Sequence, residues 1–371
     1  MHILLAVLTL VHILHADLDP NRAQADCAPD TQGVCRVRRD WTVEELRARA
    51  PMTREGDTLT FVHESDAEAV ELAGGVQYPL SHVEGTNLWT VTVRVPRLDE
   101  AMISYGFMET KGGSRAARRI PTQTWRGPNA PPKLEKAESL RGAVVKHTID
   151  SRHLGQPRGL TIYEPAKRGN APLAGVVYAG DGGAVEAFAK VLDPLVVSGR
   201  LPRILLVGIH SSESSEGRGA EYLTSFVEGD APFLAHERFF LGEVMPWVEK
   251  RYRLPDDASR RAVFGFSNSA AWALEMTLRH PQKFGRVLAF SPGGRRPNAD
   301  EALPAKSRFY LLAGTMEKGF HDIAVRWART AEERGVAHVL RTPVAGHDFE
   351  MWTSMLPDAL QWAFGGTKRE A

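Results

Sequence analysis

Residues 263–271 read Val-Phe-Gly-Phe-Ser-Asn-Ser-Ala-Ala, and this stretch decides the fold. A β-rich apolar run, 261–264, meets a Gly-x-Ser-x-small sequence and then a helical run, 271–280, with no room for an ordinary loop. A strand, a sharp turn and a helix in this order predict a nucleophile elbow, which exposes Ser267 and places it at a helix N-terminus. The alternative is a serine that caps a helix after a buried strand, because serine is a favoured N-cap residue.

The second glycine of the usual elbow pattern is replaced here by Ser269. Small residues flank the nucleophile because bulkier ones would clash in so sharp a turn. Serine adds only a hydroxymethyl group to glycine, so we expect the turn to tolerate it.

Strands and helices alternate on both sides of this stretch, from residue 142 to residue 365. Such alternation predicts an α/β catalytic domain with a mostly parallel sheet covered on both faces, and an active site beyond the carboxyl ends of the strands. The expected strands are 144–149 and 159–163, as an opening antiparallel pair, then 173–179, 203–209, 261–264, 287–290, 308–313 and 338–341. The expected helices are 185–197, 236–252, 271–280, 322–334 and 349–364.

A different pattern precedes this domain. After a short amphipathic helix within 40–50, alternating or β-branched runs at 58–63, 69–72, 88–95 and 103–108 are separated by turn residues, which predicts a small all-β sandwich over 40–110. The stretch 111–141 is rich in Gly, Pro and Arg and has no sustained period, so we expect a linker packed along the surface. Trp125 within it is expected either to act as a hydrophobic pin or to line the substrate pocket.

The N-terminus indicates export. An apolar run at 3–14 is too short to span a bilayer, and the small-x-small residues 23–25 follow it, so 1–25 is interpreted as a signal peptide that leaves no membrane span in the mature chain. A periplasmic or secreted protein is expected, and a cytoplasmic one is the alternative. Cys27 and Cys35, the two cysteines of the chain, could close a small disulfide loop in an oxidising compartment.

Composition narrows the class of protein. With 371 residues, 43% hydrophobic and 25% charged, the chain is long enough for one large globular domain and a smaller one. A formal net charge of +1 offers no basic surplus for a nucleic acid, so none is expected as a partner. The glycine cluster at 180–183 does not fit Gly-x-Gly-x-x-Gly, and neither a zinc-binding nor a phosphate-binding motif occurs, so we expect no metal and no cofactor.

Two further residues complete a candidate catalytic triad. His347 follows the last expected strand and precedes the last helix, where a serine hydrolase of this architecture keeps its general base. Glu317 follows the penultimate strand and could hold the imidazole in the required tautomer. Asp322 is the reserve candidate for the acid, although a carboxylate at the start of a helix could simply interact with the helix dipole.

An oxyanion hole requires backbone N–H groups aimed at the developing negative charge. One is expected from Asn268, next after the nucleophile. The other is expected from Gly182, in the glycine-rich turn after the strand at 173–179, where the backbone can approach a substrate closely. Asp181 in the same turn is expected to contact the substrate.

These motifs resemble the family of esterases that includes the enterochelin (ferric enterobactin) esterases. The resemblance covers 142–364 and is carried by residues 177–182, 218–222, 240–252, 265–268 and 346–348. It implies an α/β-hydrolase fold, and residues 88–89 and 104–107 are similar to the N-terminal immunoglobulin-like domain of those esterases. Arg218 matches a family arginine near the pocket, so it is expected either to meet an anionic substrate group or to pair with Glu221.

The resulting hypothesis is a serine carboxylic ester hydrolase that forms an acyl-enzyme on a small-molecule ester. The resemblance implies siderophore esters of the enterobactin type as substrates, and relatives that cleave feruloyl or acetyl esters of polysaccharides supply an alternative. A second alternative transfers the acyl group to a sugar or lipid hydroxyl. A third, from another class, is a catalytically silent protein that binds a glycan or a siderophore.

Overall fold

The computed structural model describes residues 26–27, 33–112, 114–119, 123–167, 169 and 171–365. The expected signal peptide, 1–25, lies outside the described residues. The described residues form two compact units, which fall within Met1–Pro132 with Gly314–His321 and Thr342–Met351, and within Lys133–Ala313 with Asp322–Arg341 and Trp352–Ala371. The first unit therefore includes the segments that carry Glu317 and His347, although both come late in the chain.

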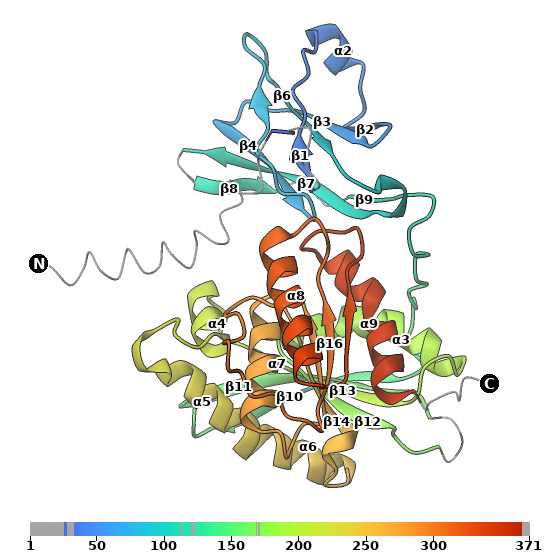
Figure 1. The fold of residues 1–371 in the computed structure, drawn as a ribbon, viewed down its shortest axis with the longest axis vertical. Coiled ribbons are helices and arrows are strands. Elements are labelled where there is room, and N and C mark those ends of the chain that lie inside the picture. Colours follow the sequence, from blue (N-terminus) through green and yellow to red (C-terminus); the bar gives the residue numbers. More distant parts are fainter. Residues whose placement is uncertain are drawn as a thin grey trace, which may run out of the picture. The chain divides into compact units, whose positions relative to one another are not determined.

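Two antiparallel sheets form most of the first unit (Figure 1). Their inner faces share one hydrophobic core, to which Phe61 and Val91 contribute from one sheet and Leu72 and Ile103 from the other. Each such side chain stabilises the domain by about 1.5–3 kcal/mol when fully buried. The first sheet contains β1 (Cys35–Arg36), β2 (Met52–Glu55), β3 (Thr58–Glu64), β5 (Ser81–His82) and β6 (Leu88–Arg94). The second contains β4 (Ala69–Gly74), β7 (Met102–Lys111), β8 (Ser114–Arg119) and β9 (Gln123–Arg126).

The all-β prediction is confirmed, but the expected linker is partly wrong. Strands β8 and β9 both lie within 111–141, and both pair antiparallel with β7. These strands were not predicted because β8 is rich in charged residues and the segment has no sustained apolar period. A β-strand at the edge of a sheet needs little apolar alternation, because its ladder hydrogen bonds come from the neighbouring strand.

Two predictions near the N-terminus agree with the structure. The short helix is α2 (Val43–Arg47), and Thr42 caps it in a reciprocal capping box with Glu45. Cys27 and Cys35 form a disulfide, with Cα atoms 5.0 Å apart. Cys35 is buried and pairs with Arg94 through β1, so the bridge fastens the start of the described chain to the first sheet.

The second unit is built on a mixed eight-stranded sheet in the order β10-β11-β13-β12-β14-β15-β16-β17. The opening pair is antiparallel, β11 and β13 are antiparallel, and all the later neighbours are parallel. This arrangement confirms the predicted α/β-hydrolase fold. The strands are β10 (Ala143–Ser151), β11 (Gln156–Glu164), β12 (Gly175–Ala179), β13 (Ile204–Ile209), β14 (Arg261–Phe266), β15 (Arg286–Phe290), β16 (Arg308–Leu312) and β17 (His338–Arg341).

Helices cover both faces of this sheet (Figure 1). Side chains of a strand alternate between faces: Tyr178 belongs to a core shared with Phe240 and Trp272, whereas Val177 lines a small cavity on the other side together with Leu192 and Leu360. The helices are α3 (Val185–Val197), α4 (Ser215–Tyr222), α5 (Ala231–Phe239), α6 (Met245–Tyr252), α7 (Asn268–Arg279), α8 (Lys318–Glu333) and α9 (Phe349–Phe364). None of the helices in the described residues combines the length and the apolar character that crossing a bilayer requires.

One helix prediction needs correction, and one helix was not predicted. The single helix expected at 236–252 is α5 and α6 joined by a π-helical turn at Phe240–Val244, and Pro246 stands in the first turn of α6, where its missing N–H costs least. Helix α4 was not expected, because Gly217 and Gly219 interrupt a polar segment that has no apolar period. Ser214 caps this helix by accepting a hydrogen bond from the N–H of Gly217.

Candidate active site

Ser267 occupies the junction between β14 and α7 in the conformation expected of a nucleophile elbow. Its backbone angles, φ 57° and ψ −129°, lie outside the regions that non-glycine residues favour. Such strain persists only where the surroundings hold it, and it is common at active sites. Here the Ser267 N–H donates to the carbonyl of Phe290 (3.0 Å), and its carbonyl accepts from the N–H of Ala270 (3.0 Å).

Gly265 is required by the sharpness of this turn. A Cβ atom at this position would lie 2.0 Å from the carbonyl oxygen of Ser269. The close approach brings the strand before the nucleophile against the first turn of α7, so only glycine fits. The first glycine of the motif is therefore set by sterics rather than by chemistry.

Ser269 is accommodated by a contact that no local pattern predicts. Its hydroxyl is fully buried, accepts a hydrogen bond from the Phe266 N–H (3.0 Å) and lies 2.7 Å from Oδ2 of Asp181, to which it can donate. Room for its Cβ comes from Gly180, where an added Cβ would lie 2.6 Å from that of Ser269. The departure from glycine thus ties the nucleophile elbow to the turn after β12.

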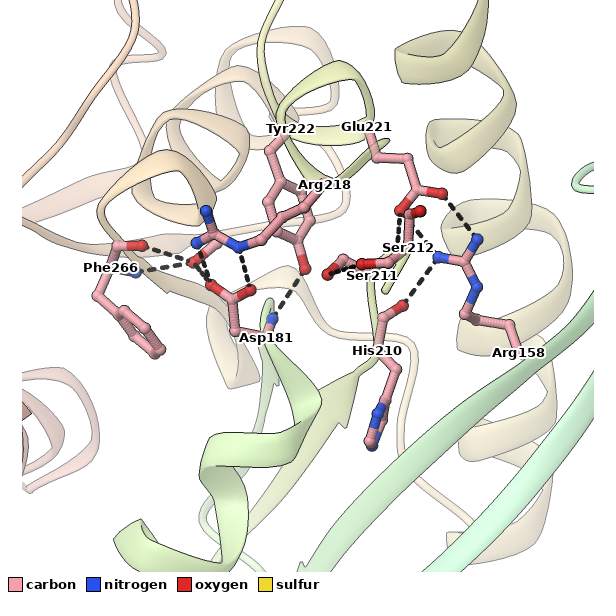
Figure 2. Close-up of polar contacts among 10 residues, drawn as sticks. Arg158, Asp181, His210, Ser211, Ser212, Arg218, Glu221, Tyr222 and Phe266 are labelled. Atoms are coloured by element: carbon pink, nitrogen blue, oxygen red, sulfur yellow. Dashed lines mark hydrogen bonds and ion pairs between the residues drawn. The ribbon is translucent and has the colours of Figure 1, made fainter. Parts of the chain in front are cut away.

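The turn after β12 is fixed by Asp181, which has a positive φ of 53°. Figure 2 shows the guanidinium of Arg218 directed at its carboxylate, with Nε 2.6 Å from Oδ1 and Nη2 2.7 Å from Oδ2. The Asp181 N–H donates to the buried phenol oxygen of Tyr222 (2.8 Å). Burial lowers the pKa of Arg218, but the hydrogen bonds and the charge of Asp181 outweigh burial and raise it, so the guanidinium keeps its charge.

The pairing of Arg218 differs from one of the two expectations. Glu221 does not bind Arg218; it forms a buried bidentate ion pair with Arg158, at 2.7 and 2.8 Å (Figure 2). Arg218 and Asp181 were both expected to contact the substrate, and in this structure their opposite charges meet each other. Both side chains therefore stabilise the turn after β12, just before Gly182.

Gly182 and Asn268, the expected oxyanion donors, begin the 3₁₀ turn Gly182–Ala184 and helix α7. Among the described residues no acceptor is bonded to either N–H, as is usual for the first amide of a helix. A Cβ atom at Gly182 would lie 2.6 Å from Cδ2 of His210 and 2.7 Å from the Gly208 carbonyl oxygen, so glycine is required at this close approach. The hydrogen bond between Ser269 and Asp181 joins the two segments that carry these amides.

His347 and Glu317 form an acid–base pair within the first unit. Nδ1 of His347 lies 2.6 Å from Oε2 of Glu317, whose side chain is 2% exposed, while that of His347 is 20% exposed. The other carboxylate oxygen accepts from the Gly314 N–H (2.6 Å), and Phe320 stacks on the imidazole at 3.9 Å. A buried carboxylate on Nδ1 fixes the tautomer that leaves Nε2 able to accept a proton.

The backbone keeps the two segments of this pair together. The N–H of Thr315 donates to the Pro343 carbonyl (3.0 Å), and that of Met316 donates to the Ala345 carbonyl (3.0 Å). A Cβ atom at Gly314 would lie 2.0 Å from the Ala345 oxygen, so the segments touch. The distance between acid and base therefore depends on main-chain bonds as well as on the side chains.

The carboxylate bonded to Nδ1 of His347 belongs to Glu317 and not to the reserve candidate Asp322. Helix α8 begins at Lys318 and has no acidic residue in its first turn, so Asp322 does not lie at the start of the helix as suggested. Trp125 lies in β9 and packs against the core of the β domain, and the guanidinium of Arg54 is 5.7 Å from its ring. Its expected role in a substrate pocket stays a prediction.

Several residues near these groups were missed by the sequence pattern. Asp348, directly after His347, accepts a hydrogen bond from Ser104 of β7. The Tyr222 hydroxyl accepts from the Asp181 N–H, and the His210 ring lies close to Gly182. Asp348 and Tyr222 lie in stretches that carry the family resemblance, but their contacts join segments far apart in the chain, so no local pattern predicted these roles. Within the described residues no cluster of His, Cys, Asp or Glu has the makeup to hold a metal ion.

The chain is similar to a known protein family and to several solved structures. The model of the family described as "Putative esterase" matches residues 151–363, and no curated protein matches the chain. The enterobactin esterase FES from Shigella flexneri, in the presence of enterobactin, superposes with a TM-score of 0.66 at 18% identity, covering 87% of this chain and 98% of its own. The ferric enterobactin esterase from Salmonella typhimurium gives 0.64 at 17% identity, covering 87% and 99%.

A ferulic acid esterase from Anaeromyces mucronatus, in complex with ferulic acid, gives a TM-score of 0.50 at 17% identity. It covers 63% of this chain and 95% of its own. At these identities the likenesses establish the fold. The two enterobactin esterases match a larger share of the chain than the ferulic acid esterase does, so their similarity extends beyond the catalytic domain.

Proposed function

Because the chain belongs to this esterase family, we propose that it is a serine carboxylic ester hydrolase that works through an acyl-enzyme on Ser267. Family membership and the esterase neighbours support hydrolysis of ester bonds. The observation that carries the serine mechanism is the strained backbone of Ser267 at the junction of β14 and α7. A helix-capping serine needs no such strain, because N-cap residues ordinarily have extended backbone angles.

In the proposed mechanism, Oγ of Ser267 attacks the acyl carbon while Nε2 of His347 takes its proton. Glu317 keeps the imidazole oriented and stabilises the imidazolium. The N–H groups of Asn268 and Gly182 stabilise the negative charge on the carbonyl oxygen. His347 then gives its proton to the departing alcohol, and a water molecule, activated by the same histidine, releases the acid and restores Ser267.

For the substrate we propose an ester of the enterobactin type. This choice is supported by the match to enterobactin esterases over 87% of the chain, against 63% for the ferulic acid esterase. Feruloyl or acetyl ester hydrolysis and acyl transfer to a glycan are the alternatives. We also propose export, which the Cys27–Cys35 disulfide supports, and sequencing of the mature N-terminus tests it.

The test replaces Ser267 by Ala and follows hydrolysis of ferric enterobactin, feruloylated xylan fragments and p-nitrophenyl acetate. We expect kcat to fall by about 10⁵-fold or more on every ester that the wild type cleaves, as for other serine nucleophiles. Ser215→Ala is the matched control, because Ser215 is exposed on α4. Unchanged turnover in the Ser267 variant would end the proposal.

Labelling with a fluorophosphonate probe separates an enzyme from a silent binding protein. An active serine reacts covalently, so the wild type should be labelled at Ser267 and the Ala variant should not. Absence of labelling in the wild type, together with binding of the ester without turnover, would favour a binding protein. Product analysis with an added sugar acceptor distinguishes hydrolysis from acyl transfer.

A further inference from the structure

The segment that carries His347 is fastened to the β domain by its backbone. The Met102 N–H at the start of β7 donates to the Val344 carbonyl (2.8 Å), and Met102 forms a parallel bridge with Ala345. A Cβ atom at Gly346 would lie 1.6 Å from the carbonyl oxygen of Gly75, so these two backbones are in direct contact. The three residues before the histidine therefore lie against strands of the β domain.

Asp348, on the other side of the histidine, is anchored to the same domain by its side chain. One carboxylate oxygen accepts from the hydroxyl of Ser104 (2.8 Å), and the other accepts from the Met351 N–H (2.9 Å) in the first turn of α9. A Cβ atom at Gly75 would lie 2.2 Å from Oδ2, so glycine is needed there to admit the carboxylate. Burial raises the pKa of Asp348, while the hydrogen bonds from Met351 and Ser104 oppose the rise.

Ser104 is itself held rigidly. It is buried in β7, where its backbone pairs with Thr124 of β9, and its carbonyl accepts from the Gly75 N–H (2.8 Å). A side chain fixed by a sheet on both sides of its strand can set the position of what it binds more precisely than a loop can. The hydroxyl of Ser104 is thus a fixed point beside the segment that carries the base.

We propose that Ser104 is a positioning residue for His347, acting through Asp348 to hold the imidazole against Glu317. This inference rests on the proposed function, since it concerns the general base of that reaction. It makes the β domain a structural part of the catalytic machinery rather than an independent module. Without the Ser104 hydroxyl, the Asp348 carboxylate keeps its bonds from the backbone N–H groups of Met351 and Ser104 but loses the side-chain bond, so it is held less firmly beside His347.

A purely structural role for Ser104 would stabilise the β domain without affecting the imidazole. Two readouts separate the roles: kcat against KM on p-nitrophenyl acetate, and the far-downfield proton NMR resonance of the His347 Nδ1–H bonded to Glu317. His347→Gln assigns that resonance by abolishing it. The resonance does not require turnover, so it tests the inference independently of the proposed function.

The experiment compares Ser104→Ala and Ser104→Thr with the wild type, and uses Ser81→Ala as the control at an exposed strand position of the same domain. We expect the Ala variant to lose about tenfold in kcat, which corresponds to about 1.4 kcal/mol, with KM within twofold and a shifted or broadened resonance. The Thr variant keeps the hydroxyl and should restore both. The control should leave both unchanged.

The outcomes are distinct. A Ser104→Ala enzyme with the kcat and resonance of the wild type overturns the inference, as does a wild type that lacks the resonance. A resonance that shifts in an otherwise inactive wild type supports the positioning role and counts against the proposed function. Should the Ala variant not fold, Ser104→Cys, a weaker donor of similar size, should show an intermediate loss of kcat and a smaller shift, and wild-type behaviour would overturn the inference.

Discussion

Glu317 and Ser267 show how single residues in this site are constrained by different forces. Ser267 keeps a strained backbone conformation that costs about 1–3 kcal/mol, and contacts in the surrounding turn must offset this cost. Glu317 keeps a carboxyl group almost fully buried, where it is hydrogen-bonded to the Gly314 N–H and to His347. The serine is constrained by backbone sterics, and the glutamate by hydrogen bonding.

Replacing Glu317 by Gln should reduce kcat by about 10³–10⁴-fold, the effect expected when the acid of a triad becomes an amide and the imidazole adopts the wrong tautomer. The shape of the side chain and its acceptor for the Gly314 N–H are retained, so folding should be preserved. The measurement is kcat on p-nitrophenyl acetate across neutral pH. Asp322→Asn is the control and should be close to wild type; the opposite ranking of the two variants would reassign the acid.

At the scale of elements, the turn after β12 depends on helix α4. Arg218 of that helix holds Asp181, Asp181 binds Ser269 of α7, and Gly182 follows directly. The Ser269 hydroxyl therefore connects the two segments that carry the proposed oxyanion donors, and the ion pair connects one of them to α4. Arg218 then has a positioning role in addition to any contact with a substrate.

Arg218→Lys tests this role, because lysine keeps the positive charge but loses the bidentate geometry. We expect kcat to fall about tenfold on both a neutral ester, p-nitrophenyl acetate, and an anionic one, p-nitrophenyl hemisuccinate, which corresponds to about 1.4 kcal/mol. Arg329→Lys, at an exposed pair with Glu333 on α8, is the control. A rise in KM confined to the anionic ester would instead assign Arg218 to substrate binding.

At the scale of the whole molecule, a buried histidine should make stability depend on pH. His236 is fully enclosed with Tyr222 and Trp272, and neither ring nitrogen has a hydrogen-bond partner among the described residues. Burial lowers its pKa from 6.5 to about 4; the charge of Glu221 opposes this shift, and that of Arg158 reinforces it. The folded protein thus keeps His236 neutral where the unfolded chain binds a proton.

Because the unfolded state takes up this proton as pH falls from 6.5 toward 4, the free energy of unfolding should fall over that window and then level off. The loss attributable to His236 is about 3 kcal/mol, since each pKa unit corresponds to about 1.36 kcal/mol. Urea denaturation between pH 4 and 8 measures it. His236→Phe should flatten this part of the curve, and an equally steep curve in the variant would exclude His236 as the cause.

Much of the architecture was accessible from the sequence, because it follows from local rules. The alternation of strands and helices after residue 142, the elbow at Ser267 and the position of His347 all depend on neighbours a few residues away. Backbone sterics and side-chain periodicity act at that range. The same reasoning failed for β8 and β9. These strands form because they pair with β7, and their own sequences show no apolar alternation.

The sequence by itself determined the fold class, the nucleophile candidate and the two segments in which its acid and base should lie. Only the tertiary structure decided partners: Glu317 rather than Asp322 for His347, Asp181 rather than Glu221 for Arg218, and Ser104 for Asp348 across a separation of 244 residues. The physical reason is that a hydrogen bond or an ion pair depends on distance in space. The folded backbone sets that distance, and a local sequence pattern cannot predict it.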